Sequence, residues 1–292
     1  MTSNQKLEFC APMHNFFWEG DDFELAPGIW IRRKKGDLSD EDLTEYNKKQ
    51  LRLEEYWLWF EWMEATIPSA GDIISLSLLS LWLTKPTKAF VAYYFCIMDK
   101  KHSKRLLDRF MWVPGNNSSK FSIAELKTAS MFYEQLNKIY HARGRLNNAM
   151  VMTLTGCRSH YWQAAFICCA AAVEGILTYE SGRGITKRLA KSYACLTEQD
   201  AVRRDAAYKE FEDLYSIRSD VMHGRIHEIP ANNCLPMLSR FQNLLRKLWQ
   251  KIMLESPNLI AVLENNDAER GLYFKVLQKN YMPPPSCKKI GE

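Results

Sequence analysis

The segment Glu212–Gly224, EDLYSIRSDVMHG, indicates both the fold and the chemistry of the second half of this chain. Leu214, Tyr215 and Arg218 follow Phe211 at intervals of three and four residues, which is the spacing of one face of an α-helix. Arg218 is therefore predicted to lie on the apolar stripe of a helix. Its guanidinium needs a partner there, because an unpaired buried charge strongly destabilises a fold.

His223 follows at the last turn of the same predicted helix, where the helix dipole favours a protonated imidazole. An arginine can clamp a phosphate through two hydrogen bonds, and a histidine can exchange protons near neutral pH. Arg218 and His223 together therefore suit phosphodiester chemistry. The alternative is purely structural: Arg218 forms an ion pair with Glu174, and His223 only caps the helix.

Helical patterns continue through most of the second half. Ser122 and Glu125 have the spacing of a capping box and are predicted to open a helix that extends to Tyr140. Gly224, just past the end of the longest helix, is expected at a C′ position. The other predicted helices cover residues 146–155, 160–179, 185–194, 198–222 and 235–254.

The first part of the chain has a mixed pattern. Phe23–Arg33 is predicted to be extended with a break at Pro27, and Leu38–Glu45 to be a short helix. Tyr56–Met63, YWLWFEWM, is interpreted as a packing element, with an exposed partner site as the alternative. Ile73–Met98 is predicted to form two strands joined near residues 85–87.

These patterns predict a mainly α protein in which a helical bundle follows a smaller N-terminal α+β region. The run of Pro, Gly, Asn and Ser in Trp112–Lys120 is the best candidate for a boundary. The predicted parts are an α+β region over 1–115, a helical domain over 122–255, and a partly flexible C-terminal extension over 256–292.

Three segments of the helical half resemble the Apea-like branch of the HEPN superfamily. They are AAFICCAAAVEGIL at Ala164–Leu177, GITKRLAKSYACL at Gly184–Leu196, and LYSIRSDVMHG at Leu214–Gly224. The third matches the Tyr-x2-Arg-Ser-x3-His-Gly signature of that branch. FELAPGIWIRR at 23–33 and ISLSLLSLWL at 74–83 also look like the region that precedes the domain, so the resemblance covers most of the chain.

The resemblance implies a helical HEPN domain and a metal-independent endoribonuclease in which two copies of the motif line one cleft. Arg218 would stabilise the scissile phosphate, and His223 would act as general acid or base. The ribose 2′-OH would be the nucleophile, which explains a preference for RNA over DNA. Proteins of this kind resemble bacterial toxins and phage-defence effectors, and some members are catalytically silent.

Several neighbours of the motif are candidate supporting residues. Tyr215 and Ser219 belong to the signature, and Asp220 is expected to be solvated or paired with Arg225. Glu174 lies among alanines and cysteines and needs a cation. It is expected to orient Arg218 or polarise His223, or else to form a structural pair with Arg188 or Arg218. Candidates for contact with RNA are Arg183, Lys187, Arg188, Arg225 and His227. For Arg183, Lys187 and Arg188 the alternative is a solvated basic face.

Composition adds broad expectations. The 292 residues carry a formal charge of +5, which permits a polyanionic partner without requiring one. The eight cysteines show no disulfide framework, and an apolar leader is absent from the N-terminus, so a reducing cytoplasm is expected. No second ligand pair accompanies Cys157 and His160, so neither a metal nor a cofactor is predicted. The apolar stretches are too short or too interrupted to suggest a membrane span.

Three functions are compatible with these features. The first is a HEPN ribonuclease acting in defence, as a homodimer or with a related HEPN chain. The second is a catalytically silent module that dimerises or binds RNA within a larger complex, with the aromatic N-terminal region binding a partner. The third is a module that senses RNA or nucleotides. The sequence lacks nucleotidyltransferase, ATPase and reverse transcriptase signatures, so a sensor or antitoxin would be a separate chain.

Overall fold

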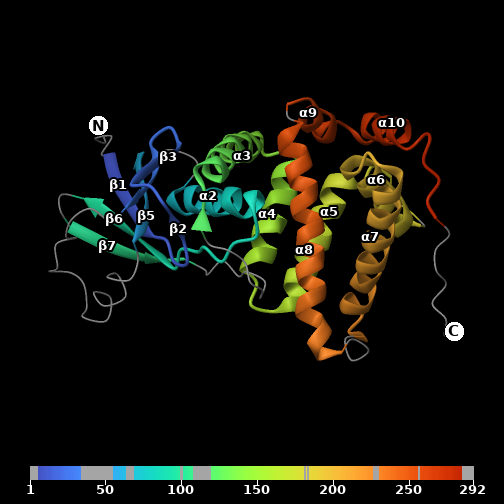
Figure 1. The fold of residues 1–292 in the computed structure, drawn as a ribbon, viewed down its shortest axis with the longest axis horizontal. Helices are drawn as coiled ribbons and strands as arrows, with labels where there is room; N and C mark the ends of the chain where they lie inside the picture. Colours follow the sequence, from blue (N-terminus) through green and yellow to red (C-terminus); the bar gives the residue numbers. More distant parts are fainter. Residues whose placement is uncertain are drawn as a thin grey trace. The chain divides into compact units, whose positions relative to one another are not determined.

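The chain folds into two compact units, Met1–Ala142 and Arg143–Glu292. Among the residues that the structure describes, strands and the helices α2 and α3 make up the first unit, whereas the second is helical (Figure 1). The predicted helix at 38–45 and most of the predicted boundary segment lie outside the described residues. The computed structural model describes residues 6–33, 55–63, 69–98, 101–107, 120–180, 182, 184–225, 230–255 and 257–284.

A six-stranded antiparallel sheet forms the framework of the first unit, in the order β3-β4-β5-β1-β6-β7. Its strands are β1 (Lys6–Pro12), β3 (Asp22–Ala26), β4 (Ile29–Arg33), β5 (Tyr56–Met63), β6 (Tyr93–Met98) and β7 (Lys101–Leu106). Two short strands, β2 (Phe17–Trp18) and β8 (Lys120–Phe121), pair in parallel beside it. The extended segment predicted at Phe23–Arg33 is the β3–β4 hairpin, and its turn contains Gly28 at φ +77°.

The aromatic segment β5 is a packing element of this sheet. It pairs with β1 on one side and with β4 on the other. Tyr56, Trp57, Leu58 and Phe60 are all at most 3% exposed. Trp57 packs in a cluster that also contains Cys10, Tyr93 and Phe95. The packing interpretation therefore holds for these four side chains, because burial of aromatic rings on both faces of a central strand supplies much of the core.

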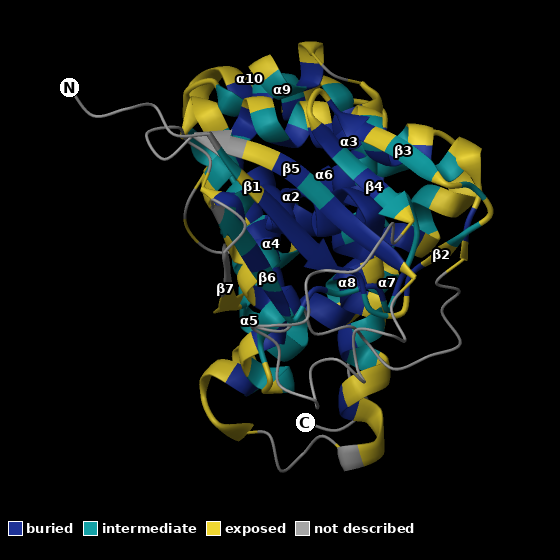
Figure 2. Cartoon of the chain, turned by 90° about the vertical axis from the view of Figure 1, so that its left-hand side faces the viewer, coloured by how far each residue is buried: buried dark blue, intermediate teal, exposed yellow. Residues whose placement is uncertain are grey.

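The first strand predicted in Ile73–Met98 is wrong, because residues Ala70–Thr84 form helix α2. Ser69 and Asp72 form a capping box at its start. Hydroxyl groups inside the helix donate to the preceding turn, as in Ser77 Oγ to the Ile73 carbonyl oxygen at 2.8 Å. Most of α2 is buried, and Figure 2 shows it in dark blue. A helix buried on all sides has no polar face, so its sequence carries no helical periodicity.

The second predicted strand is confirmed as β6, and the helix predicted after Ser122 is α3 (Ile123–Ala142). The backbone N–H of Ser122 donates to Glu125 Oε2 at 2.8 Å, which completes the predicted capping box. Tyr140 then donates to Asp72 Oδ2 at 2.8 Å and ties α3 to α2. Because α3 packs with the sheet, the two units divide after Ala142 rather than in the segment Trp112–Lys120.

In the described part of the second unit, the helices α4 to α8 form the body, and each corresponds to a predicted one. Figure 1 shows α7 and α8 running in opposite directions. Gly224 has φ +72° at the end of α7, the left-handed conformation expected of a C′ glycine. No helix within the described residues has the length and apolar character needed to cross a bilayer. The five are α4 (Arg145–Arg158), α5 (Trp162–Leu177), α6 (Ile185–Thr197), α7 (Ala201–Met222) and α8 (Ala231–Leu254).

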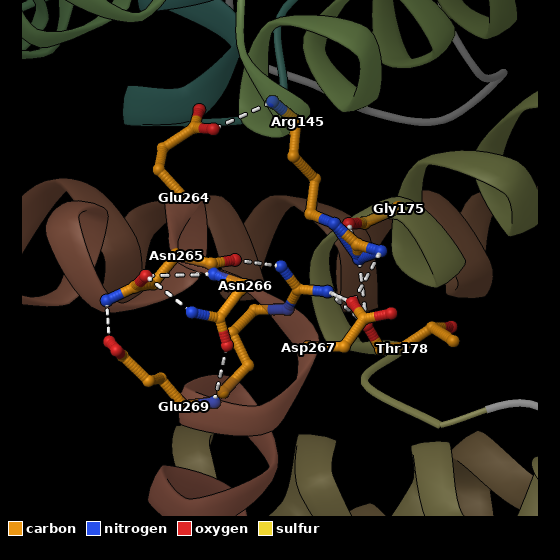
Figure 3. A network of polar contacts seen from close by, with 9 residues as sticks. Arg145, Gly175, Thr178, Glu264, Asn265, Asn266, Asp267 and Glu269 are labelled. Atoms are coloured by element: carbon orange, nitrogen blue, oxygen red, sulfur yellow. Dashed lines mark hydrogen bonds and ion pairs between the residues drawn. The ribbon is translucent and has the colours of Figure 1, made fainter.

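The predicted C-terminal extension contains two further helices, α9 (Asn258–Glu264) and α10 (Asp267–Leu277). They join the unit through the polar network of Figure 3. Glu264 accepts hydrogen bonds from the backbone N–H groups of Arg145 at 2.7 Å and Leu146 at 2.9 Å. These are the first residues of α4, whose N-cap is Gly144 and has no side chain to cap the helix. A Cβ at Gly144 would clash with the Glu264 carboxylate, so glycine allows this close approach.

Two arginines complete the network at the end of α5. Arg145 Nη1 donates to the carbonyl oxygens of Gly175 at 3.1 Å and Thr178 at 2.8 Å. Arg270, which is 3% exposed, donates to the same Thr178 oxygen at 3.3 Å. Cations at a helix C-terminus satisfy its free carbonyls and complement its dipole. The helices α9 and α10 therefore hold the end of α5 as well as the start of α4.

Replacing Glu264 with alanine is expected to destabilise the protein by about 2 kcal/mol, because two N–H groups at the start of α4 lose a charged acceptor. That loss corresponds to a decrease in Tm of about 4–8 °C, measured by circular dichroism. Glu134→Ala is the control, since Glu134 is exposed on α3. Equal melting temperatures for Glu264→Ala and Glu134→Ala would show that this contact contributes nothing to stability.

Candidate functional site

One carboxylate oxygen of Glu174 contacts two residues of the predicted motif, Arg218 and Tyr215. Arg218 Nε lies 2.7 Å from Glu174 Oε1, and the Tyr215 hydroxyl donates to the same oxygen at 2.6 Å. Arg218 and Tyr215 come from α7, whereas Glu174 comes from α5. The Arg218 guanidinium also lies over the Tyr215 ring, 5.9 Å from its centroid. Glu174 therefore pairs with Arg218, one of the two cations that the sequence suggested for it.

Tyr215 connects this ion pair to the core of the second unit. Its ring stacks on Phe211 at 5.7 Å, and Phe211 stacks on Tyr193 at 5.0 Å. Burial raises the pKa of Tyr215, and the hydrogen bond to Glu174 raises it further because that bond needs the phenolic proton. Tyr215 is therefore a neutral donor at physiological pH and fixes the position of the Glu174 carboxylate.

The Arg218–Glu174 pair is only partly buried. The side chain of Arg218 is 37% exposed and that of Glu174 is 25% exposed. Arg218 thus lies at the edge of the apolar stripe and not within the core. A guanidinium has five N–H donors, and the contact with Glu174 is made at Nε. The terminal nitrogens of Arg218 can therefore still bind an anion while Glu174 holds the side chain in place.

His223 occupies the end of α7, where the backbone leaves the helical conformation at φ −94° and ψ 9°. Its backbone N–H donates to the Ser219 carbonyl oxygen at 3.0 Å, so the last turn is closed. The residue is exposed. Within the described part of the chain, the imidazole makes no hydrogen bond or ion pair. The helix end thus presents the ring to solvent.

The remaining polar residues of the motif form a small cluster beside His223. Arg225 Nε donates to Asp220 Oδ1 at 3.1 Å, and Arg225 Nη2 lies 3.4 Å from Ser219 Oγ. The predicted ion pair between Asp220 and Arg225 is therefore present. Arg225 is exposed, and its guanidinium contacts both Asp220 and Ser219. These contacts hold Arg225 against the last turns of α7.

Arg218 and His223 lie on different sides of α7. Five residues of an α-helix turn through about 500°, which places two side chains about 140° apart around the axis and about 7.5 Å apart along it. Glu174 holds Arg218 against α5, whereas His223 faces solvent. The two side chains therefore point away from the helix in different directions.

The predicted RNA-contact residues at the start of α6 are not part of this cluster. Arg188 Nη2 donates to the Gly182 carbonyl oxygen at 3.1 Å and lies 3.5 Å from that of Glu180. It thus braces the turn before α6 and does not pair with Glu174. Lys187 is exposed on α6. Arg183 and His227 lie outside the described residues.

The described residues contain no group of three or more His, Cys, Asp or Glu side chains that could hold a metal ion. Cys157 is 1% exposed, and burial raises its pKa to about 12. His160, in contrast, is exposed. A buried neutral thiol is a poor metal ligand, because the thiolate is the form that binds. Cys157 therefore lies buried in α4, whereas His160 lies in the segment between α4 and α5.

The sequence-based prediction missed a group of cations on α7 and α8, away from the motif. Arg203 on α7 and Arg240, Arg246 and Lys247 on α8 line one cavity. The sequence does contain a pattern that indicates a polar helix face there. Polar residues recur at three- and four-residue spacing, namely Arg240, Asn243, Lys247 and Gln250. The shared acceptor role of Glu174 for Tyr215 was also not predicted.

Neither a protein-family model nor a curated protein nor a solved structure matches this chain.

Proposed function

We propose that this protein is a HEPN-type endoribonuclease that cleaves RNA by attack of the ribose 2′-OH and needs no metal ion. The observation that carries the proposal is the arrangement at the end of α7. Glu174 and Tyr215 position Arg218 with its terminal nitrogens available, while His223 is exposed at the helix end. An arginine that binds an anion and a histidine that transfers protons are the groups this reaction requires.

In the proposed reaction a bond forms between O2′ and phosphorus, and the bond between phosphorus and O5′ breaks. A base removes the proton from O2′, and an acid supplies a proton to O5′. The products are a 2′,3′-cyclic phosphate and a free 5′-hydroxyl. Arg218 would stabilise the additional negative charge on the phosphate oxygens in the transition state.

The attacking and leaving oxygens lie on opposite sides of phosphorus, so one imidazole cannot readily serve both. A two-fold symmetric dimer supplies two His223 side chains and two Arg218 side chains, because an isologous interface brings identical residues together. Met222, 56% exposed next to His223, offers apolar surface for such an interface. The second copy could also be a related HEPN chain.

A catalytically silent RNA-binding or dimerisation module is the second candidate. The observation that favours it is the Arg218–Glu174 ion pair itself, because a purely structural arginine would make the same contact. The resemblance to defence proteins suggests an antiviral or toxin role for either candidate, with a separate chain as sensor or antitoxin.

We expect the purified protein to cleave single-stranded RNA in the presence of EDTA and to leave 2′,3′-cyclic phosphate ends. The same oligonucleotide with 2′-deoxyribose at the cleaved position should resist, because its nucleophile is missing. Mass spectrometry of the products measures both results. Activity that disappears with EDTA and returns with Mg²⁺ would contradict the mechanism. Binding of RNA without cleavage would favour the silent module instead.

A further inference from the structure

A cavity of about 700 Å³ lies between α6, α7 and α8 of the second unit. Cavities of this size typically hold an organic molecule rather than a single ion. Its α7 wall extends from Arg203 to Glu210, and Arg218 of the motif follows eight residues, or about 12 Å, farther along the helix. A ligand in this cavity would therefore lie away from the motif.

Two ion pairs in the lining neutralise its carboxylates. Arg240 Nε lies 3.2 Å from Glu210 Oε1, which joins α8 to α7. Lys247 pairs with Glu198, the C-cap residue of α6, which joins α8 to the end of α6. Glu198 and Glu210 are the carboxylates of the described lining. Because each already has a cation, they repel an incoming anion less than free carboxylates would.

Two polar side chains of the lining have no partner among the described residues. Arg203 on α7 and Asn243 on α8 are exposed, and neither side chain makes a hydrogen bond or an ion pair there. The guanidinium of Arg203 can bind a phosphate through two hydrogen bonds. The amide of Asn243 offers both a donor and an acceptor, the combination that recognises the edge of a nucleobase. Arg246 and Gln250 also line the cavity, but both already have interaction partners.

A buried hydroxyl of the cavity wall also lacks a partner. Tyr193 lines the cavity and is fully buried, and its hydroxyl makes no hydrogen bond with the described residues. Thr197 lies beside it, but the Thr197 hydroxyl donates to the Tyr193 carbonyl oxygen at 2.9 Å. Burial raises the pKa of Tyr193, and the nearby carboxylates of Glu210 and Glu198 raise it further. The hydroxyl is thus a protonated donor beside the cavity, and an acceptor on a ligand would satisfy it.

Apolar side chains separate the charged residues of the lining. Ala207 on α7 and Leu244 on α8 are buried, and each comes between charged lining residues of its own helix. The ring of Tyr193 stacks on Phe211 at 5.0 Å, which fixes the position of its hydroxyl. An apolar wall with a few fixed polar groups is suited to a flat ring that has polar edges.

We propose that this cavity binds a nucleoside monophosphate. The phosphate contacts Arg203, and the base packs against Ala207 and Leu244. The edge of the base pairs with the Asn243 amide, and the Tyr193 hydroxyl donates to an acceptor on the base or the ribose. The site is separate from the motif, so it does not require the proposed nuclease activity.

The test measures binding of AMP, GMP, CMP and UMP to the purified full chain by isothermal titration calorimetry. At least one nucleotide should bind at least tenfold more tightly than inorganic phosphate or its own nucleoside, because each of these makes only part of the contacts. Arg203→Ala should weaken nucleotide binding about tenfold and leave nucleoside binding unchanged. Tyr193→Phe retains the ring and should weaken nucleotide binding about fivefold, through the loss of one hydrogen bond. If Tyr193→Phe does not fold, the exposed position Arg203 still decides the test.

Lys209→Ala is the matched control for Arg203→Ala, because Lys209 is exposed on the same helix and does not line the cavity. Tyr208→Phe is the control for Tyr193→Phe, since Tyr208 is also a buried tyrosine but lies outside the lining. Both controls should bind the nucleotide as the wild type does. Absence of nucleotide binding, equally tight binding of phosphate alone, or equal losses in the controls would overturn the proposal. Binding that is lost in Arg218→Ala and kept in Arg203→Ala would place the nucleotide at the motif and overturn it as well.

Discussion

His223→Ala is expected to reduce RNA cleavage by a factor of about 10²–10⁴, the usual contribution of a general acid or base. Melting should change little, because His223 is exposed and only its backbone N–H takes part in closing the last turn of α7. Alanine retains that N–H. Initial cleavage rates and circular dichroism melting measure the two effects separately.

His160→Ala is the matched control, since His160 is also exposed and lies outside the motif. Its cleavage rate should equal that of the wild type. Mixing wild-type protein with an excess of His223→Ala adds a test of the shared site. The activity should decrease below simple dilution, because hybrid dimers lack one of the two histidines. Full activity of His223→Ala would remove this residue from the mechanism, and an unchanged rate in the mixture would show that each chain acts alone.

Glu174→Gln is expected to lower the cleavage rate by about 10²-fold, because a displacement of Arg218 by about 1 Å is enough for such a loss. The glutamine oxygen can still accept from Tyr215, but the charge that attracts Arg218 is gone. The stability cost should be about 1–2 kcal/mol. It lies below the 3–5 kcal/mol of a fully buried pair because the Arg218 side chain is 37% exposed.

A double-mutant cycle with Arg218→Ala tests whether Glu174 acts through Arg218. If it does, adding Glu174→Gln to Arg218→Ala should cause little further loss of rate, since the two residues form one unit. Asp213→Asn, an exposed acid on α7, serves as the control. Full additivity of the two changes, or equal losses in Asp213→Asn, would contradict a positioning role for Glu174.

The spacing of apolar residues predicted a helix correctly where that helix has one buried and one solvent-facing side. The helices α3, α4, α6 and α8 each bury one face, and each was predicted from its spacing of apolar residues. Helix α2 was predicted as a strand because burial on nearly all sides removes the polar positions that reveal a helical period. The start of helix α10 could have been predicted from its sequence, because Asn266 caps it and Asp267 and Glu269 lie in its first turn.

The sequence alone was enough to place Arg218 on a helix and His223 at the helix end. It also predicted the capping box of α3, since all of these features depend on residues only a few positions apart. Only the tertiary structure decided which cation pairs with Glu174. Glu174 comes from another helix and shares its oxygen with Tyr215, 41 positions away. Glu264 caps α4 across 119 positions, and the cavity between α6, α7 and α8 combines three helices. Such contacts depend on how segments far apart in the sequence pack together. They produce no periodic pattern of residues within any single helix, so they cannot be predicted from the sequence of that helix.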